Sequence, residues 1–279
     1  MDKSIYTAMS GAVRTLTAQS TVSNNLANAS TVGFRAELAM ATTAPVDGDG
    51  LPTRVASTFG GGAFDPSVGT LMTTDRPLDV AVRGSGWIAV QDASGEPAYT
   101  RNGELQIDAL GQLVTSRGEL VLGEGGPIAI PPHENVTSAD DGTVSVIPQG
   151  KGGAVQATVA RIRVDNIQPQ AMRRGDDGLF RPGEDAAVEP AAGAALSVGT
   201  LESSNVNLAQ SLVEMIALSR QFELQVKAIR SADAATEAAN TLPTRAKFQA
   251  TTLAESKHNQ TNAAPASYTH LTLPTTYAV

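Results

Sequence analysis

Residues 208–233 read LAQSLVEMIALSRQFELQVKAIRSAD. Apolar and small residues recur here at alternating steps of four and three, which is the spacing of one face of an α-helix. Ser203, Ser204 or Asn205 could cap the start of this helix, and Pro243 lacks the amide hydrogen that further helix requires. We therefore predict a helix from about Val206 to Leu242. Its stripe consists of Leu208, Leu212, Met215, Ser219, Phe222, Val226, Ile229 and Asp233.

A second stripe with the same spacing opens the chain. Gly33 could end this helix by taking a positive φ just beyond its last turn. Other apolar residues flank both stripes, so the apolar surface is wider than a two-stranded coiled coil needs. We expect contacts among several helices, within the chain or between copies. The N-terminal stripe consists of Ile5, Met9, Ala12, Leu16, Gln19, Ser23 and Leu26.

The residues between the two stripes have a different character. Residues 35–76 are rich in Gly, Pro, Thr and Asp, which indicates an extended connecting segment. Short apolar runs and turn signals then alternate, as in compact antiparallel β structure. We therefore predict an α+β fold in which N- and C-terminal helices pack together beside a central, mainly antiparallel β domain. The expected strands cover residues 78–82, 87–90, 105–107, 113–115, 120–122, 128–130, 144–147 and 155–164.

Composition and charge exclude several classes of function. The net charge is −8, and Lys and Arg cluster only at Arg173-Arg174, so we expect no nucleic-acid partner. No run approaches the roughly 20 apolar residues of a membrane span, so we expect no membrane insertion. The chain has no cysteine, which excludes disulfides and thiolate chemistry. No basic segment followed by an apolar run marks a cleaved signal peptide.

One segment resembles a cofactor motif. Gly84-Ser85-Gly86-Trp87-Ile88-Ala89 matches G-x-G-x-x-A and is followed by Asp108. A dinucleotide site needs a helix after these glycines, whereas residues 87–90 have the pattern of a strand. We favour glycines of a β turn. A cofactor-binding enzyme built on the central β domain remains the alternative from another class.

The titratable residues form no recognisable catalytic or metal-binding set. The histidines are isolated from one another, and metal sites and catalytic triads both need partners. The paired aspartates precede glycine, which is typical of solvated turns. We expect no catalytic, cofactor-binding or metal site. The residues considered are His133, His258, His270, Asp140, Asp141, Asp176 and Asp177.

Three asparagines near the end of the first predicted helix lower its helix propensity. They are Asn24, Asn25 and Asn28. Their amides could cap free backbone groups where the helix ends. They could equally donate hydrogen bonds to neighbouring chains in a packed assembly, where unpaired polar groups would be costly. Spacing alone leaves both interpretations open.

The segment around these asparagines resembles a family signature. Residues 23–35, SNNLANASTVGFR, resemble the N-N-L-A-N-x-x-T-x-G-F signature of bacterial flagellar rod and hook proteins. Further similar segments follow in the family's order, so the resemblance covers roughly residues 1–242. These segments are PLDVAVRGSGW (77–87), YTRNG (99–103), GQLVT (111–115), GPI (126–128), LESSNVN (201–207), Met215-Ile216, RQFE (220–223) and Lys227.

The resemblance implies a structural subunit of the rod that crosses the periplasm. Residues 5–12 and the modest length are most similar to subunits of the proximal rod, with a distal-rod or hook-family subunit as the alternative. Such a subunit is exported by the flagellar type III apparatus without a cleaved signal peptide. Its partners are copies of itself and other rod subunits.

The resemblance also implies a division of the chain. Residues 1–30 and 191–242 would form the wall of a helical tube, residues 31–75 the connection, and residues 76–190 an outer β domain. Residues 243–279 depart from the family and have the character of a disordered, non-native tail. The expected assembly interface contains Ile5, Met9, Ala12, Leu16, Asn24, Asn25, Leu26, Asn28, Gly33, Phe34, Leu208, Leu212, Met215, Phe222, Val226 and Ile229.

Overall fold

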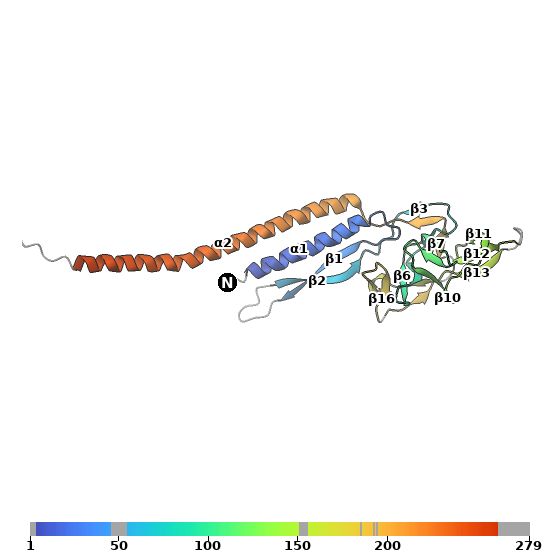
Figure 1. Ribbon diagram of the computed structural model, residues 1–279, viewed down its shortest axis with the longest axis horizontal. Helices are drawn as coiled ribbons and strands as arrows, with labels where there is room; N and C mark the ends of the chain where they lie inside the picture. The colour runs from blue at the N-terminus through green and yellow to red at the C-terminus, as the bar shows by residue number, and fades with distance from the viewer. Residues whose placement is uncertain are drawn as a thin grey trace, which may run out of the picture.

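The computed structural model describes residues 4–45, 55–150, 156–184, 186–191, 193 and 195–261. Two helices, α1 (Ser4–Ala27) and α2 (Leu208–Thr261), run side by side at one end of an elongated molecule, and most of the strands lie at the other end (Figure 1). Within the described residues, neither helix contains an apolar stretch that could cross a membrane. The predicted α+β fold, with terminal helices packed together and a central antiparallel β region, is confirmed.

The strands form one large sheet and several small ones, and all the pairings are antiparallel. The large sheet has the order β15-β16-β6-β5-β9-β8-β7, with β10, β14 and β17 attached; β11-β12-β13 form a second sheet, and β1-β2, β18-β4 and β19-β3 form pairs. The strands are β1 (Glu37–Pro45), β2 (Val55–Phe64), β3 (Leu71–Thr73), β4 (Val80–Val82), β5 (Gly86–Gln91), β6 (Pro97–Thr100), β7 (Leu105–Ile107), β8 (Leu113–Thr115), β9 (Leu120–Gly123), β10 (Gly126–Pro127), β11 (His133–Ser138), β12 (Thr143–Pro148), β13 (Ala157–Arg161), β14 (Val164–Asn166), β15 (Met172–Arg174), β16 (Phe180–Pro182), β17 (Glu189–Pro190), β18 (Leu196–Val198) and β19 (Thr200–Glu202).

The core of the β region surrounds β5. This strand pairs with β6, β9 and β14, and its residues Trp87 to Val90 are buried on both faces. One side contacts an aliphatic cluster that includes Leu105 and Leu113, and the other an aromatic cluster of Trp87, Phe64 and Phe180. The rings of Trp87 and Phe180 have centroids 4.7 Å apart. The apolar runs of the sequence therefore form this core.

The predicted connecting segment contains two paired strands that the sequence did not indicate, β1 and β2. Strands β1 and β2 pair from Glu37 opposite Phe64 to Pro45 opposite Val55, and the hairpin lies along α1 (Figure 1). Its Ala, Thr and Gly side chains give no alternation of apolar and polar residues, so the sequence carried no period-2 signal. The segment Asp47–Pro52 lies outside the described residues.

The predicted end of the second helix is also wrong, since α2 continues through Pro243 to Thr261. A proline inside a helix removes one backbone hydrogen bond and crowds the carbonyl four residues earlier. The alanine-rich stretch that precedes it has high helix propensity, and helix continues on both sides. The expected disordered tail is therefore helical over residues 243–261, and residues 262–279 lie outside the described part.

Most predicted strands coincide with observed ones, and β7 and β8 match residue for residue. The predicted strand at residues 128–130 is wrong: only Ala129 makes an isolated bridge, to Gln112. Pro127 and Pro131 flank this segment, and neither has an amide hydrogen to donate to a ladder. The predicted strand at 155–164 is two strands, β13 and β14.

Candidate assembly interface

Helices α1 and α2 pack through small and medium-sized side chains. On α1 the buried side contains Ala12, Thr15 and Val22, and the half-buried residues of α2 recur every three or four positions. The Thr15 hydroxyl lies 3.0 Å from both the Gly11 carbonyl and Oε1 of Gln225 on α2. The inward residues of α2 are Ser211, Met215, Leu218, Phe222, Gln225, Val226, Ile229, Ala232 and Thr236.

A second apolar stripe of α1 faces away from this contact. Met9 is 50% exposed, Val13 61% and Leu16 49%. The predicted stripe is therefore divided in the monomer: Ala12 is buried, whereas Met9 and Leu16 are about half exposed. Val13 lies on the same exposed side as Met9 and Leu16, because side chains three or four positions apart share a face.

Helix α2 likewise keeps large apolar side chains on its outer surface. Leu208 and Leu212 belong to the predicted stripe, yet 54% and 49% of their surface is exposed. Exposed apolar residues that follow each other along one helix indicate a binding surface, whereas a single one would be unremarkable. The exposed set on α2 comprises Leu208, Leu212, Val213, Ile216 and Leu224.

The expected interface residues therefore fall into three groups in the monomer. Met9, Leu16, Asn24, Leu208 and Leu212 are exposed. Leu26, Asn28, Met215, Phe222, Val226 and Ile229 are half-buried, and Ala12, Asn25, Gly33 and Phe34 are buried. The side chain of Ile5 lies outside the described residues.

The asparagines at the end of α1 bond within the chain. Asn25 Nδ2 donates to the Glu37 carbonyl at 2.9 Å, and the Glu37 amide donates to Asn25 Oδ1 at 2.8 Å. Asn28 Nδ2 donates to the Asn24 carbonyl, and Asn28 Oδ1 accepts from the Thr31 hydroxyl. Asn25 thus fixes where the hairpin leaves α1, and Asn28 closes the helix end. The exposed Asn24 side chain has no hydrogen bond among the described residues.

Gly33 allows the connection from α1 to approach the β region. Its φ is 67°, a conformation that favours glycine, and its amide donates to the Glu202 carbonyl at 2.7 Å. A side-chain carbon at this position would lie 2.2 Å from the carbonyl carbon of Arg101. Gly33 therefore does not end α1, which ends six residues earlier at Ala27. It allows a close backbone contact with the β region instead.

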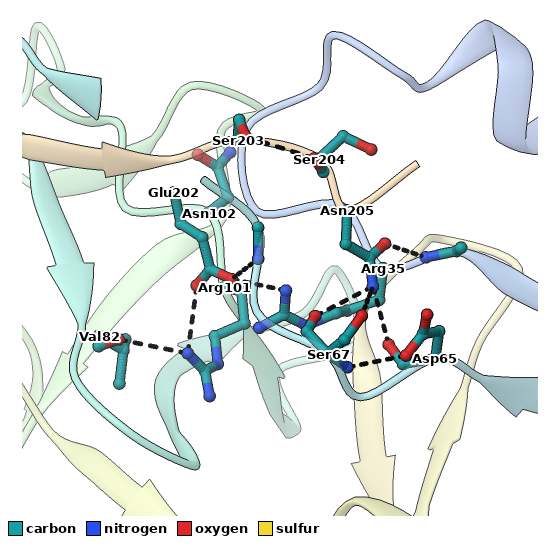
Figure 2. Close-up of polar contacts among 12 residues, drawn as sticks. Arg35, Asp65, Ser67, Val82, Arg101, Asn102, Glu202, Ser203, Ser204 and Asn205 are labelled. Carbon is teal, nitrogen blue, oxygen red and sulfur yellow. Dashed lines mark hydrogen bonds and ion pairs between the residues drawn. The ribbon is translucent and has the colours of Figure 1, made fainter. Parts of the chain in front are cut away.

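A buried charge network joins the segments that lead to the two helices (Figure 2). Glu202 lies between two arginines: its Oε1 is 2.5 Å from Nη1 of Arg35, and its Oε2 is 3.1 Å from Nη1 of Arg101. All three side chains are at most 3% exposed. Arg101 also donates to the carbonyls of Val82 and Gly84, so the network anchors both terminal segments on the β domain.

Asn205 provides a second junction beside the network (Figure 2). Its Oδ1 accepts from the Ala36 amide at 2.7 Å, and its Nδ2 donates to the carbonyls of Asp65 and Ser67. The prediction that Ser203, Ser204 or Asn205 caps α2 is wrong. Asn207 caps it, because its Oδ1 accepts from the Gln210 amide at 3.1 Å.

No pattern in the sequence predicts that Glu202, Arg101 and Asn205 lie together. Charged residues separated by long stretches of chain have no periodicity that could mark them as partners. The one usable signal was that Arg35, Arg101, Glu202 and Asn205 all fall within the segments that resemble the family. A charged residue placed inside such a segment is a candidate for a buried pair.

The cofactor-like glycine segment is part of the sheet. Gly84 lies in a turn between β4 and β5, with φ of 74°, and Gly86 begins β5. No helix follows it, so the segment cannot present a helix N-terminus to a pyrophosphate. His133 Nδ1 lies 3.0 Å from the Pro131 carbonyl, as in a local turn contact.

Three family models match separate parts of the chain. Residues 5–35 match a flagella basal body rod protein model, residues 81–146 a D1 domain model of the flagellar hook protein FlgE/F/G, and residues 197–242 a C-terminal model of the flagellar basal body rod FlgEFG protein. These matches include the helix α1, the core of the β region and the first part of α2.

Whole proteins are similar over almost their full length. The flagellar basal-body rod protein FlgF of Escherichia coli is 44% identical over 241 residues, which are 84% of this chain and 95% of the relative. FlgF of Salmonella typhimurium is 44% identical with the same coverage, and the rod protein FlgG of Buchnera aphidicola is 34% identical over 76% of this chain and 88% of the relative. The chain therefore belongs to the family of flagellar basal-body rod proteins and, within it, to the FlgF proteins.

Proposed function

We propose that this chain is a structural subunit of the rod of the bacterial flagellum, and that it polymerises through the outer faces of α1 and α2. The observation that carries the proposal is the exposed apolar surface of the helix pair. Side chains such as Val13 and Leu16 on α1, and Leu212 and Ile216 on α2, are about half exposed in the monomer. In a tube of packed helices the neighbouring subunits would cover them.

The energetics favour such an assembly. Full burial of a Leu, Val or Ile side chain is worth about 1.5–3 kcal/mol, and these side chains still have about half of that to gain. Several of them per subunit give enough free energy to offset the loss of translational and rotational freedom on association. The β region has its own core and needs no neighbour, so it would project from the tube as the outer domain.

We further propose that the subunit belongs to the proximal rod. Two FlgF relatives are 44% identical to this chain, whereas two FlgG relatives are 32–34% identical and further FlgF relatives 30–32%. The expected partners are copies of this chain, other rod subunits, and the flagellar type III export apparatus, with no cleaved signal peptide. The tube wall is assigned to residues 1–30 and 191–242, and the outer domain to residues 76–190.

The test replaces one exposed apolar side chain in a bacterium whose own FlgF is removed. Val13→Asp should leave the stability of the monomer almost unchanged, because Val13 is 61% exposed there, and should remove the chain from purified basal bodies. The matched control is Leu110→Asp, since Leu110 is 83% exposed on a turn of the β region. The control should assemble normally. Normal incorporation of Val13→Asp would refute the proposed interface.

The location of the unaltered chain tests the function itself. Co-purification with basal bodies supports a rod subunit, and the chain found only free in the medium would favour a secreted binding module. A chain that lacks residues 1–30 should fail to join the rod, and motility restored by that chain would contradict the proposal.

A further inference from the structure

Two arginine side chains converge on one point beside the junction of the helices and the β region. A side-chain carbon on Gly178 would lie 2.8 Å from Nη1 of Arg117 and 3.7 Å from Nη2 of Arg174. Arg174 also stacks on Phe34, with its guanidinium carbon 4.5 Å from the ring centroid. Arg117 is exposed and donates only a long bond, 3.4 Å, to the Asp177 carbonyl. One guanidinium is therefore held in place and the other is accessible.

These arginines line a small pocket together with Arg35. Its walls also include Thr31, Gly33 and Asn102, and none of the residues described as lining it carries a carboxylate. Its volume is about 20 Å³. A site of this size holds about one water-sized group, so a single oxygen atom can enter it.

The nearby carboxylates are engaged elsewhere. Glu202 forms ion pairs with both Arg35 and Arg101. One carboxylate therefore faces two guanidinium groups, which leaves one positive charge in excess. Asp177 pairs with Arg181 at 2.6 Å. Glu37 attracts Arg174, but the two form no ion pair among the described residues. The positive charge around the pocket is thus only partly compensated.

The pKa and the hydrogen bonding of Arg174 agree with this excess of positive charge. Desolvation lowers its pKa, repulsion by Arg117 lowers it further, and Glu37 opposes both in part. Its Nη1 is buried and has no hydrogen-bond partner in the described part of the chain. A buried donor of this kind costs free energy unless a partner arrives.

We propose that the pocket between Arg117 and Arg174 binds a carboxylate, supplied in the assembled rod by a neighbouring copy of this chain. Two guanidinium forks match the planar geometry of a carboxylate. The assignment of the source rests on the proposed polymer, in which the 28 acidic residues of each copy supply the carboxylates.

The carboxylate preference can be tested on the monomeric full-length chain by nuclear magnetic resonance. Titration with acetate at constant ionic strength should shift the Gly178 amide and the arginine Nε–Hε signals until they saturate, whereas chloride should not. Arg117→Gln or Arg174→Gln should weaken acetate binding about tenfold or more. Arg173→Gln is the matched control, because Arg173 is on the same strand but points to the opposite face.

Three results would overturn the site: no saturation with acetate, equal shifts with chloride, or tighter binding of inorganic phosphate than of acetate. The source is tested by Arg117→Glu, which should be exported normally but join basal bodies about tenfold less than the unaltered chain. Equal incorporation would exclude a neighbour's carboxylate. Failure of the unaltered chain to join basal bodies would refute the rod function. The carboxylate site would still be supported if acetate binding saturates.

Discussion

Oε1 of Glu202 lies 2.5 Å from Nη1 of Arg35, although one residue follows α1 and the other precedes α2. The same carboxylate binds Arg101 of the β domain, so three distant parts of the chain meet at one buried acid. A buried charge is stable only when it is paired, because the low dielectric penalises it strongly. The junction between the helix pair and the β region therefore depends on Glu202.

Glu202→Gln should destabilise the chain by about 3–5 kcal/mol, because two buried arginines would lose the carboxylate that pairs with both of them in the described part of the chain. Urea unfolding followed by circular dichroism measures this. The control is Glu124→Gln, which removes an exposed carboxylate 3.9 Å from Arg161 and should cost about 1 kcal/mol or less. Equal effects of the two variants would contradict a structural role for the network.

Asn25→Ala should open the junction between α1 and β1. It removes two hydrogen bonds to the Glu37 backbone, at 2.9 and 2.8 Å, in a buried site, and each unsatisfied partner costs about 1–3 kcal/mol. Hydrogen exchange should become faster at the Glu37 amide. Asn24→Ala, at the exposed neighbour, should leave that exchange unchanged, and faster exchange in both variants would argue against the specific contact.

Gly33→Ala should be far more harmful than the same change at Gly84. Both glycines have a positive φ, 67° and 74°, so alanine at either position costs about 1–2 kcal/mol for the conformation. Only Gly33 also meets the Arg101 backbone, whereas a side chain at Gly84 has open space. Thermal unfolding should show the difference, and similar melting temperatures for the two variants would show that the close approach is not required.

The sequence predicted the existence of the two helices because helical periodicity is a local signal. It did not predict which face packs inside the chain, since Ala12 and Leu16 are both apolar and only one of them is buried. Thr15 is buried and meets Gln225 of α2, whereas the adjacent Leu16 is about half exposed. That distinction depends on the partner helix.

The junction was less predictable than the helices. Asn25 was recognised as unusual, but spacing could not separate bonds within the chain from bonds to a neighbour. The pairing of Glu202 with Arg35 depends on how the two ends of the chain meet, which only the folded structure decides. The β1–β2 hairpin was not predicted either, because its Ala, Thr and Gly residues carry no period-2 pattern and its contacts with α1 form only in the folded chain.

Tyr99 gives the chain a distinct response to alkaline pH. Burial raises its pKa to about 12. The neighbouring Asp165, which accepts a hydrogen bond from the Tyr99 hydroxyl at 3.0 Å, adds to the effect. In the unfolded chain the pKa is 10.0. Between these values the unfolded chain loses a proton that the folded chain keeps, so stability falls as pH rises from about 10 to about 12.

The difference in absorbance at 295 nm between the unaltered chain and Tyr99→Phe isolates this group. It should change near pH 12 in the folded protein and near pH 10 in urea. Tyr99→Phe should also show a weaker loss of stability in that pH range. A difference signal that titrates near pH 10 in the folded protein would show that the hydroxyl is not held by Asp165.

The part of α2 beyond the reach of α1 gives the last prediction. The helices are antiparallel, and Thr15 meets Gln225, so the start of α1 at Ser4 lies opposite about Thr236. The match to the family's C-terminal model ends at residue 242, yet α2 continues to Thr261. A stop after Leu242 should therefore leave the contact between α1 and α2 intact.

In a tube of packed helices the overhang would occupy space that the next subunit needs. At 1.5 Å per residue, the stretch from Pro243 to Thr261 is roughly 28 Å long, comparable with α1 itself. The shortened chain should therefore have an unchanged melting temperature and should join basal bodies at least as well as the full chain. Loss of assembly after the stop, with the melting temperature preserved, would instead make residues 243–279 part of the native interface.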